Sequence, residues 1–224
     1  MDFAKALTYP FEDDDWLKKV GLAVLIQFIP IIGQMVIQGW TFETSKNVRN
    51  NEPTPMVNWQ FGELLGRGFI LFIASFIYQI PTILFACGIS FVFVLPAFAG
   101  SEDAAAALAG TASLIAICCS CLIVIYAIAA QLVYIAGWVR FIDQPELSTF
   151  LQFGDNIALF RENIGDFGQA ILFLIGGGIL GSIVASLTAG LGSLLLQPFL
   201  AYFSAHIFGQ LAQKVGGTPA VPAV

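Results

Sequence analysis

Residues 167–213 read FGQAILFLIGGGILGSIVASLTAGLGSLLLQPFLAYFSAHIFGQLAQ and contain no Asp, Glu, Lys or Arg. Three further stretches are also free of charge: residues 20–42, 68–101 and 104–139. A helix needs roughly 20 mostly apolar residues to cross the hydrocarbon core of a bilayer, and every one of these stretches is long enough. We therefore predict an all-α, polytopic helical membrane protein in which residues 1–214 form a single membrane domain.

The composition supports this assignment and excludes several classes of function. Hydrophobic residues make up 58% of the chain and charged residues 11%, whereas a soluble domain carries about 25% charged residues. The net charge of −6 comes without the basic patch that nucleic-acid binding requires. We expect the lipid bilayer as a partner and no nucleic acid.

The positions of the Lys and Arg residues predict the topology. They lie before the first charge-free stretch, between the first and second, between the third and fourth, and after the last. Because Lys and Arg gather in short cytoplasmic loops, the connections near 101–103 and 188–193, which have none, should lie outside. We predict four full transmembrane helices in the cell membrane, with a cytoplasmic C-terminus. The membrane segments are expected near residues 20–43, 68–98, 104–139, 168–188 and 194–213, with interfacial amphipathic helices near 56–67 and 146–166 and a flexible tail at 215–224.

The first membrane segment does not fit a simple span. Basic residues flank it on both sides, and Pro30 and Gly33 lie in its centre. Proline removes a backbone hydrogen bond and glycine permits a turn, so the pair predicts a helix break. One interpretation is a re-entrant hairpin that enters and leaves on the cytoplasmic side. The alternative is a fifth, proline-kinked span with the N-terminus outside. The acidic run before it, residues 12–15, is expected in the first turn of a helix that begins near Trp16, where the helix dipole favours negative charge.

A short internal repeat precedes two of the membrane segments. Residues 60–63, Gln-Phe-Gly-Glu, recur at 152–155 as Gln-Phe-Gly-Asp, and an arginine follows each copy. Both copies start on the same predicted side of the membrane, so a true repeat would be parallel rather than inverted. A four-residue match also arises by chance, and both interpretations stay open.

Several short motifs follow one another in an order that is found in one family. They are Phe11-Glu-Asp-Asp-Asp-Trp16, Ile29-Pro30-Ile-Ile-Gly33, Gly39-Trp40, Trp59 with Gly68, Tyr78-Gln-Ile-Pro81 and Ala205-His206-Ile-Phe-Gly209-Gln210-Leu. Through them the chain resembles domain-of-unknown-function family 4013, an uncharacterised prokaryotic membrane family. The resemblance implies a multi-pass helical fold. It implies no activity, and it carries over no catalytic residue.

Polar residues inside the apolar stretches are the candidates for a functional site. His206 is the only histidine, so a catalytic Ser–His or Cys–His pair would have to use it. One histidine without an embedded carboxylate makes no ordinary metal site, and we expect no catalytic residues, metal or cofactor. Glutamine is costly in hydrocarbon and should face water or another helix. The candidate lining of a polar cavity is Gln34, Gln38, Gln79, Gln131 and His206. The alternative is that each of these residues bonds locally to a neighbouring helix.

Small residues recur every four positions in the segment 168–188. One stripe is formed by Gly177, Gly181 and Ala185, and the adjacent stripe by Gly178, Ser182 and Ser186. Stripes of small residues let helices approach closely in a membrane. They predict helix packing, either within this chain or between copies in a homo-oligomer.

Together these features favour a multi-pass membrane protein that is not an enzyme and acts as a structural or partner-binding component. Its protein partner would be a second copy or another membrane protein. The alternative is a passive channel or transporter for a small polar solute or lipid, which requires the polar residues to converge on a wet cavity. A lipid-modifying enzyme that uses His206 is a third hypothesis.

Overall fold

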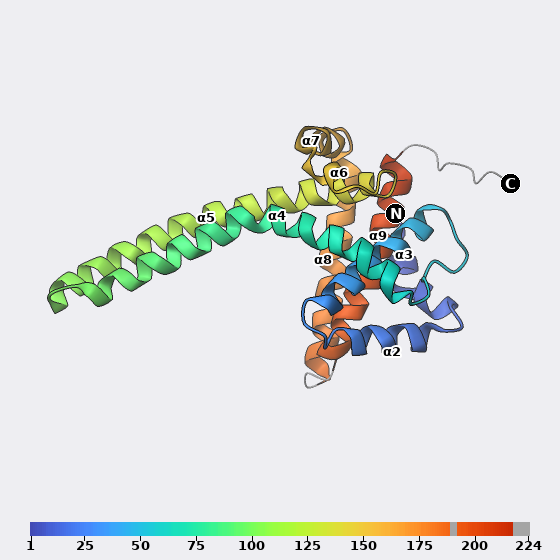
Figure 1. Cartoon of the computed structure of the whole chain (residues 1–224), viewed down its shortest axis with the longest axis horizontal. Helices are drawn as coiled ribbons and strands as arrows, with labels where there is room; N and C mark the ends of the chain where they lie inside the picture. Colours follow the sequence, from blue (N-terminus) through green and yellow to red (C-terminus); the bar gives the residue numbers. More distant parts are fainter. Residues whose placement is uncertain (189–191, 217–224) are drawn as a thin grey trace. The chain divides into compact units, whose positions relative to one another are not determined.

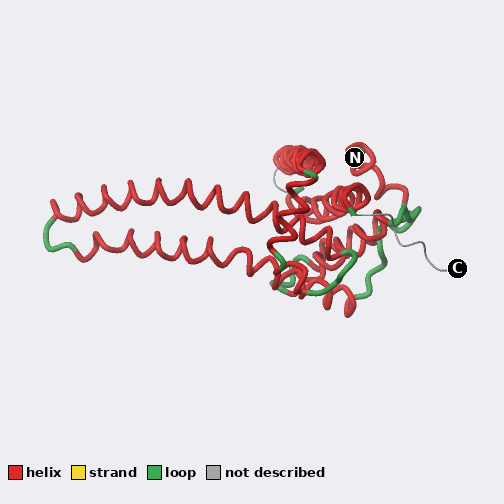
Figure 2. The backbone as a smooth tube through the Cα atoms, turned by 90° about the horizontal axis from the view of Figure 1, so that it is seen from above, coloured by secondary structure: helices red, strands yellow, loops and turns green. Residues whose placement is uncertain are grey.

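The computed structural model describes residues 1–188 and 192–216, and all of its secondary-structure elements in these ranges are helices (Figure 2). Three helical stretches are long and apolar enough to cross a membrane: Phe61–Phe98, Glu102–Phe141 and Ile164–Leu187. The all-helical fold is therefore confirmed. The segment predicted at 194–213 is not among the three, so the number of four full spans stays a prediction. Residues 189–191 of the predicted turn and 217–224 of the predicted tail lie outside the described residues.

The chain forms two compact units, of which one comprises Ser75–Tyr134 and the other Met1–Ala74 with Ile135–Val224. We refer to Ser75–Tyr134 as the hairpin unit and to the remainder as the body. In the hairpin unit, α4 (Phe61–Val94) and α5 (Glu102–Phe141) run antiparallel (Figure 2). The hydroxyl of Tyr126 donates to the backbone oxygen of Tyr78 across the pair at 2.9 Å. The α-helix ends at Val94 because Pro96 follows in the short helix η2 (Leu95–Phe98), and proline disfavours helical backbone before it.

The beginning of α4 differs from the prediction of a separate interfacial helix near 56–67. Residues 53–60 form no helix, and α4 begins at Phe61 and continues past residue 67 without a break. Pro53 and Pro55 disfavour helical backbone at the residue before each of them, and the chain stays non-helical until α4 begins. No proline stands between 61 and 68, and the glycines there, Gly62, Gly66 and Gly68, are accommodated within α4. The predicted interfacial helix and the span are therefore one helix.

The body is built around α9 (Ser193–Val215), against which α3 (Ile32–Arg49) and α8 (Ile164–Leu187) pack. Figure 1 shows α8 and α9 side by side. The helix α3 runs parallel to α9, because Gln197 bonds Gln34 at one end while Gln213 bonds the backbone of Val48 at the other. The shorter elements of the body are α1 (Phe3–Thr8), η1 (Tyr9–Glu12), α2 (Trp16–Ile26), α6 (Leu147–Leu151) and α7 (Phe153–Glu162). Its core contains Tyr9, Val36, Ile37, Trp40, Met56, Leu64 and Ala201.

The predicted first membrane segment is two helices, α2 and α3, joined by residues 27–31. Ile31 takes a positive φ of 63°, which is uncommon for a branched residue. At Gly33 the chain folds back so closely that a Cβ would lie 2.1 Å from the backbone oxygen of Ile26. The helical path is therefore interrupted at residues 27–31, which include Pro30, while Gly33 lies in the first turn of α3 and permits the close approach to Ile26. A helix of 11 residues is about 16 Å long, so α2 alone is too short to cross a bilayer.

The two Gln-Phe-Gly-acid segments share a local conformation. Phe61 begins α4 and Phe153 begins α7. The backbone oxygen of each preceding glutamine accepts from the N–H four residues later, at 3.0 and 3.1 Å. The segments differ beyond this point, because α7 ends at Glu162 while α4 continues. The interfacial region predicted near 146–166 holds α6 and α7, and a true repeat stays a prediction.

One stripe of small residues on α8 faces α9. A Cβ on Gly177 would lie 2.3 Å from the ring of Phe203, and one on Gly181 would lie 2.6 Å from Leu196. On the adjacent stripe, a Cβ on Gly178 would meet nothing within 4 Å. The hydroxyls of Ser182 and Ser186 donate to carbonyls of their own helix. The packing within the chain thus uses Gly177 and Gly181, with Ala185 half-buried beside them, and a homo-oligomer through the other stripe stays a prediction.

Candidate functional site

The predicted polar residues do not share one place in the body. Gln79 and Gln131 belong to the hairpin unit. In the body, Gln34 Oε1 accepts from the amide of Gln197 at 3.2 Å. His206 lies nine positions further along α9, which corresponds to about 13 Å along the helix axis. None of the four glutamines lines the cavity that contains His206, and the carboxamide oxygen of Gln38 is buried without a partner among the described residues.

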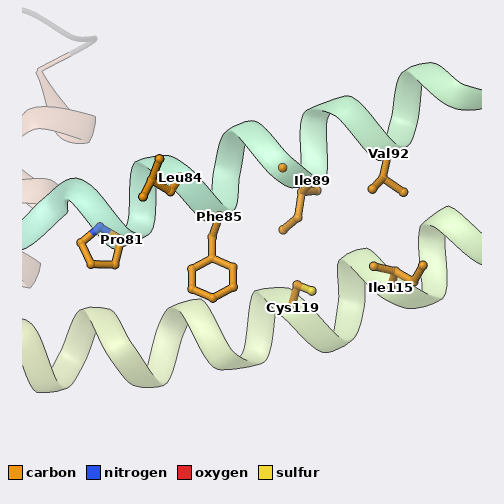
Figure 3. Close-up of a pocket in the computed structure, with 8 residues that line it drawn as sticks. Pro81, Leu84, Phe85, Ile89, Val92, Ile115 and Cys119 are labelled. Atoms are coloured by element: carbon orange, nitrogen blue, oxygen red, sulfur yellow. The ribbon is translucent and has the colours of Figure 1, made fainter.

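The hairpin unit carries an apolar groove of about 570 Å³ (Figure 3). In that view Phe85 and Ile89 point from α4 toward α5, and Ile115 and Cys119 face them. The remaining lining residues, Pro81, Leu84, Gly88 and Val92, are also apolar. This groove is apolar apart from the thiol of Cys119, whereas the cavity around His206 gathers ionisable and hydrogen-bonding side chains. We therefore take the cavity around His206 as the candidate site.

The cavity around His206 measures about 410 Å³ and lies in the body, where α1, η1, the loop after α3 and α9 meet. We call it the His206 cavity. Its polar lining is formed by Asp2, Lys5, Tyr9, Glu12, Asn51, Glu52, His206, Gln210 and Gln213, and its apolar lining by Val48, Pro53 and Pro55. It thus combines the sole histidine with three carboxylates and one ammonium group.

The hydrogen bonds of Gln210 determine the protonation of His206. The backbone N–H of Asp2 donates to one carboxamide atom of Gln210 at 2.5 Å, and since an N–H needs an acceptor, that atom must be Oε1. The amide nitrogen then donates to the backbone oxygen of Asp2 at 3.0 Å and to Nδ1 of His206 at 2.6 Å. Nδ1 is therefore an acceptor, and a neutral ring carries its proton on Nε2.

Nε2 of His206 has no hydrogen-bond partner among residues 1–188 and 192–216. The side chain is 6% exposed, so most of the ring is out of water while this one donor is left unused. Because Nε2 is not among the fully buried side-chain atoms that lack a partner, the atom stays accessible to water. The His206 cavity is where a ligand atom or water can accept from it.

Tyr9 holds the imidazole in place from the other side. The two rings are stacked, with centroids 4.6 Å apart and planes at 30°. The hydroxyl of Tyr9 donates to the backbone oxygen of Tyr202 at 2.7 Å. Burial raises the pKa of the Tyr9 phenol well above its ordinary value, so this hydroxyl stays protonated and remains a donor. The orientation of His206 is fixed by Tyr9 and Gln210 together.

Charges around the cavity are unevenly balanced. Lys5 bonds both carboxylate oxygens of Glu12 at 2.6 Å, and both side chains are about half exposed. Asp2 accepts from the backbone N–H of Lys5 and caps α1, while no ion pair of Glu52 occurs among the described residues. The carboxylates of Asp2 and Glu52 are thus left without a cationic side chain.

Sequence reasoning found His206 but missed most of its surroundings. Asp2 and Gln210 are 208 positions apart, and Tyr9 and Tyr202 are 193 apart. No periodicity relates residues at such separations, because α1 and η1 dock on α9 through the tertiary fold. The one local signal is the four-residue spacing of His206 and Gln210, which places both on one face of a helix.

Comparison with known proteins identifies one family. A family model described as a protein of unknown function (DUF4013) matches residues 22–190, about three quarters of the chain. No curated protein and no solved structure matches the chain.

Proposed function

We propose that this chain, which belongs to the DUF4013 family, is a non-enzymatic membrane component that binds a partner at the His206 cavity. The observation that carries the proposal is the state of the imidazole. Its Nδ1 accepts from Gln210, so the ring offers the cavity a proton donor at Nε2. A general base needs the opposite arrangement, with a free lone pair directed at the reacting group. This arrangement supports recognition by a proton donor rather than general-base catalysis.

The position of the cavity also favours binding. It lies at the end of α9 that carries Lys214, which the distribution of Lys and Arg predicts to be cytoplasmic. Glu52 and Asn51 at its rim are exposed, so a polypeptide can approach them. A partner bound there would supply an acceptor for the donor of His206.

Photo-cross-linking tests this function in the native membrane. With p-benzoylphenylalanine at Glu52, we expect a light-dependent adduct with one defined polypeptide, and the adduct should weaken at least several-fold when His206→Leu removes the donor. The same cross-linker at Glu102, an exposed acid of the hairpin unit, is the matched control. Absence of an adduct at Glu52, or identical adducts at both positions, would refute the proposal. An adduct of twice the mass of the chain would identify the partner as a second copy.

We further propose that α2 and α3 form a re-entrant hairpin with both ends on the cytoplasmic side. Contacts along α9 support this arrangement. Asp2 bonds Gln210 near the C-terminal end of α9, where Gln213 also donates to the backbone of Val48. Gln27, in the turn between α2 and α3, donates to the backbone oxygen of Leu194 at the other end. The N-terminal segment that precedes α2 and the end of α3 thus lie beside the same end of α9.

Site-directed labelling distinguishes this hairpin from a fifth span. In a background with all four cysteines replaced by alanine, Ala4→Cys and Asn50→Cys are exposed positions. We expect an impermeant maleimide to label both from the cytoplasmic side in inverted vesicles, and neither in sealed right-side-out vesicles. The re-entrant arrangement is wrong if Ala4→Cys is labelled from the outside while Asn50→Cys is not.

A further inference from the structure

We infer that the His206 cavity binds an alkylammonium group, presented as a lysine side chain of the partner, together with a carbonyl oxygen of the same segment. This inference rests on the proposed function and names the chemistry of its partner. It follows from the charges of the cavity, its apolar wall and its unused donor.

The charges select a cation. Three carboxylates line the cavity, and the one ammonium group, Lys5, is already bonded to both oxygens of Glu12. The N-terminal ammonium group of Met1 interacts with Asp2, but Glu52 has no ion pair among the described residues. Because three carboxylates face one ammonium side chain, the lining keeps a negative potential that a positive ligand would neutralise. Anionic ligands such as phosphates or carboxylates would face these carboxylates without a free cationic side chain to pair with.

The apolar wall suits an alkyl stem. Val48, Pro53 and Pro55 form it, and Pro55 is buried while Pro53 is exposed at the rim. A lysine side chain can place its methylene groups along such a surface while its ammonium group reaches carboxylates at the rim. A guanidinium group prefers to bind one carboxylate with two parallel hydrogen bonds, whereas a compact ammonium can be shared between separate acids.

The donor of His206 supplies the second contact. Nε2–H lies at a side chain that is 6% exposed and has no partner among the described residues. A cation cannot accept from it, so a ligand that displaces water from this donor needs an acceptor beside its ammonium group. A backbone carbonyl of the residue that carries the lysine provides one, and this is why we favour a peptide over a free amine.

The single histidine makes the test direct. Protein labelled with [13Cε1]histidine and purified through a histidine-free tag gives one imidazole signal, because the chain has one histidine. We expect N-acetyl-lysine methylamide to shift this signal saturably with a Kd in the low millimolar range, about 1–5 mM. N-acetyl-norleucine methylamide lacks the ammonium group and pentylamine lacks the carbonyls, and each should bind at least about tenfold more weakly.

Two variants complete the design. Glu52→Gln should weaken the lysine analogue several-fold, and Glu102→Gln in the hairpin unit should leave its affinity unchanged. The inference is overturned if the norleucine analogue binds as well as the lysine analogue, if pentylamine alone matches it, or if no ligand shifts the signal. If Glu52 cross-links to a polypeptide but any of these binding results is obtained, the chain still binds a partner and the bound group is not a lysine. The proposed function and the further inference can therefore fail independently.

Discussion

Replacement of Gly68 by alanine should destabilise the body by more than about 3 kcal/mol, although it adds one methyl group. A Cβ at this position would lie 1.6 Å from the backbone oxygen of Met35 and 3.0 Å from the backbone nitrogen of Gly39. Backbone atoms cannot rotate away as a side chain can, so α3 and α4 would have to separate. Inserting a methyl group into tight packing usually costs 1–3 kcal/mol, and occasionally more.

Gly66 provides the matched control in the same helix. A Cβ there meets nothing within 4 Å, and alanine is favoured over glycine in a helix by about 1 kcal/mol. Gly66→Ala should therefore leave the melting temperature unchanged or raise it. Gly68→Ala should lower it by at least about 6 °C, at about 2–4 °C per kcal/mol for a chain of this size. Thermal unfolding in mild detergent measures both, and two variants that melt together would show that α3 and α4 do not cross at Gly68.

The sequence was sufficient to predict where most helices lie, for an identifiable reason. An absence of charge over 20 or more residues is a local property, and hydrocarbon imposes it residue by residue. The predicted segments 104–139 and 168–188 accordingly correspond to α5 and α8, which begin and end within a few residues of these limits. The end of α4 before Pro96 is predicted by the same kind of local argument.

Contacts between distant segments were beyond the same reasoning. The acidic run before Trp16 was expected to sit in the first turn of a helix, and this prediction was wrong: the first turn of α2 has no acidic residue. Asp13 instead bonds Lys19. The prediction from charge-free stretches also misplaced the beginning of α4. It put a helix boundary near residue 68, where the charged residues end, although the helix runs through this position without a break.

The candidate site also combines a local property of the sequence with contacts between distant segments. His206 stood out because it is the only histidine, which is a property of composition. Its tautomer depends on Gln210 and on the backbone of Asp2, and that hydrogen-bond network exists only after α1 has docked on α9. The sequence therefore indicated a polar site near His206, whereas the role of His206 as a hydrogen-bond donor could be inferred only from the structure.

Removal of Lys19 should be the most damaging change of charge in the body. Its ammonium group donates to Asp13 at 2.6 Å and to the backbone oxygen of Met56 at 2.8 Å. The side chains of Lys19 and Asp13 are 9% and 8% exposed. Lys19→Ala would leave the Asp13 carboxylate buried without a counter-ion, and breaking a buried pair in this way costs about 3–5 kcal/mol. The adjacent Lys18 is exposed, so Lys18→Ala should change the free energy of unfolding by less than about 0.5 kcal/mol.

A double variant distinguishes the cost of leaving Asp13 without a counter-ion from the cost of losing the Lys19 side chain itself. Asp13→Asn with Lys19→Met leaves no buried charge, and a buried pair exchanged for neutral groups is often tolerated. We expect the double variant to recover most of the stability that Lys19→Ala loses, as measured by thermal unfolding in detergent. A double variant that is less stable than either Asp13→Asn or Lys19→Met would contradict this account.

The same substitution should also affect the His206 cavity. Lys19 anchors Met56, which lies next to Pro55 in the wall of this cavity. Lys19→Ala should therefore weaken the saturable shift of the histidine signal, whereas Lys18→Ala should not.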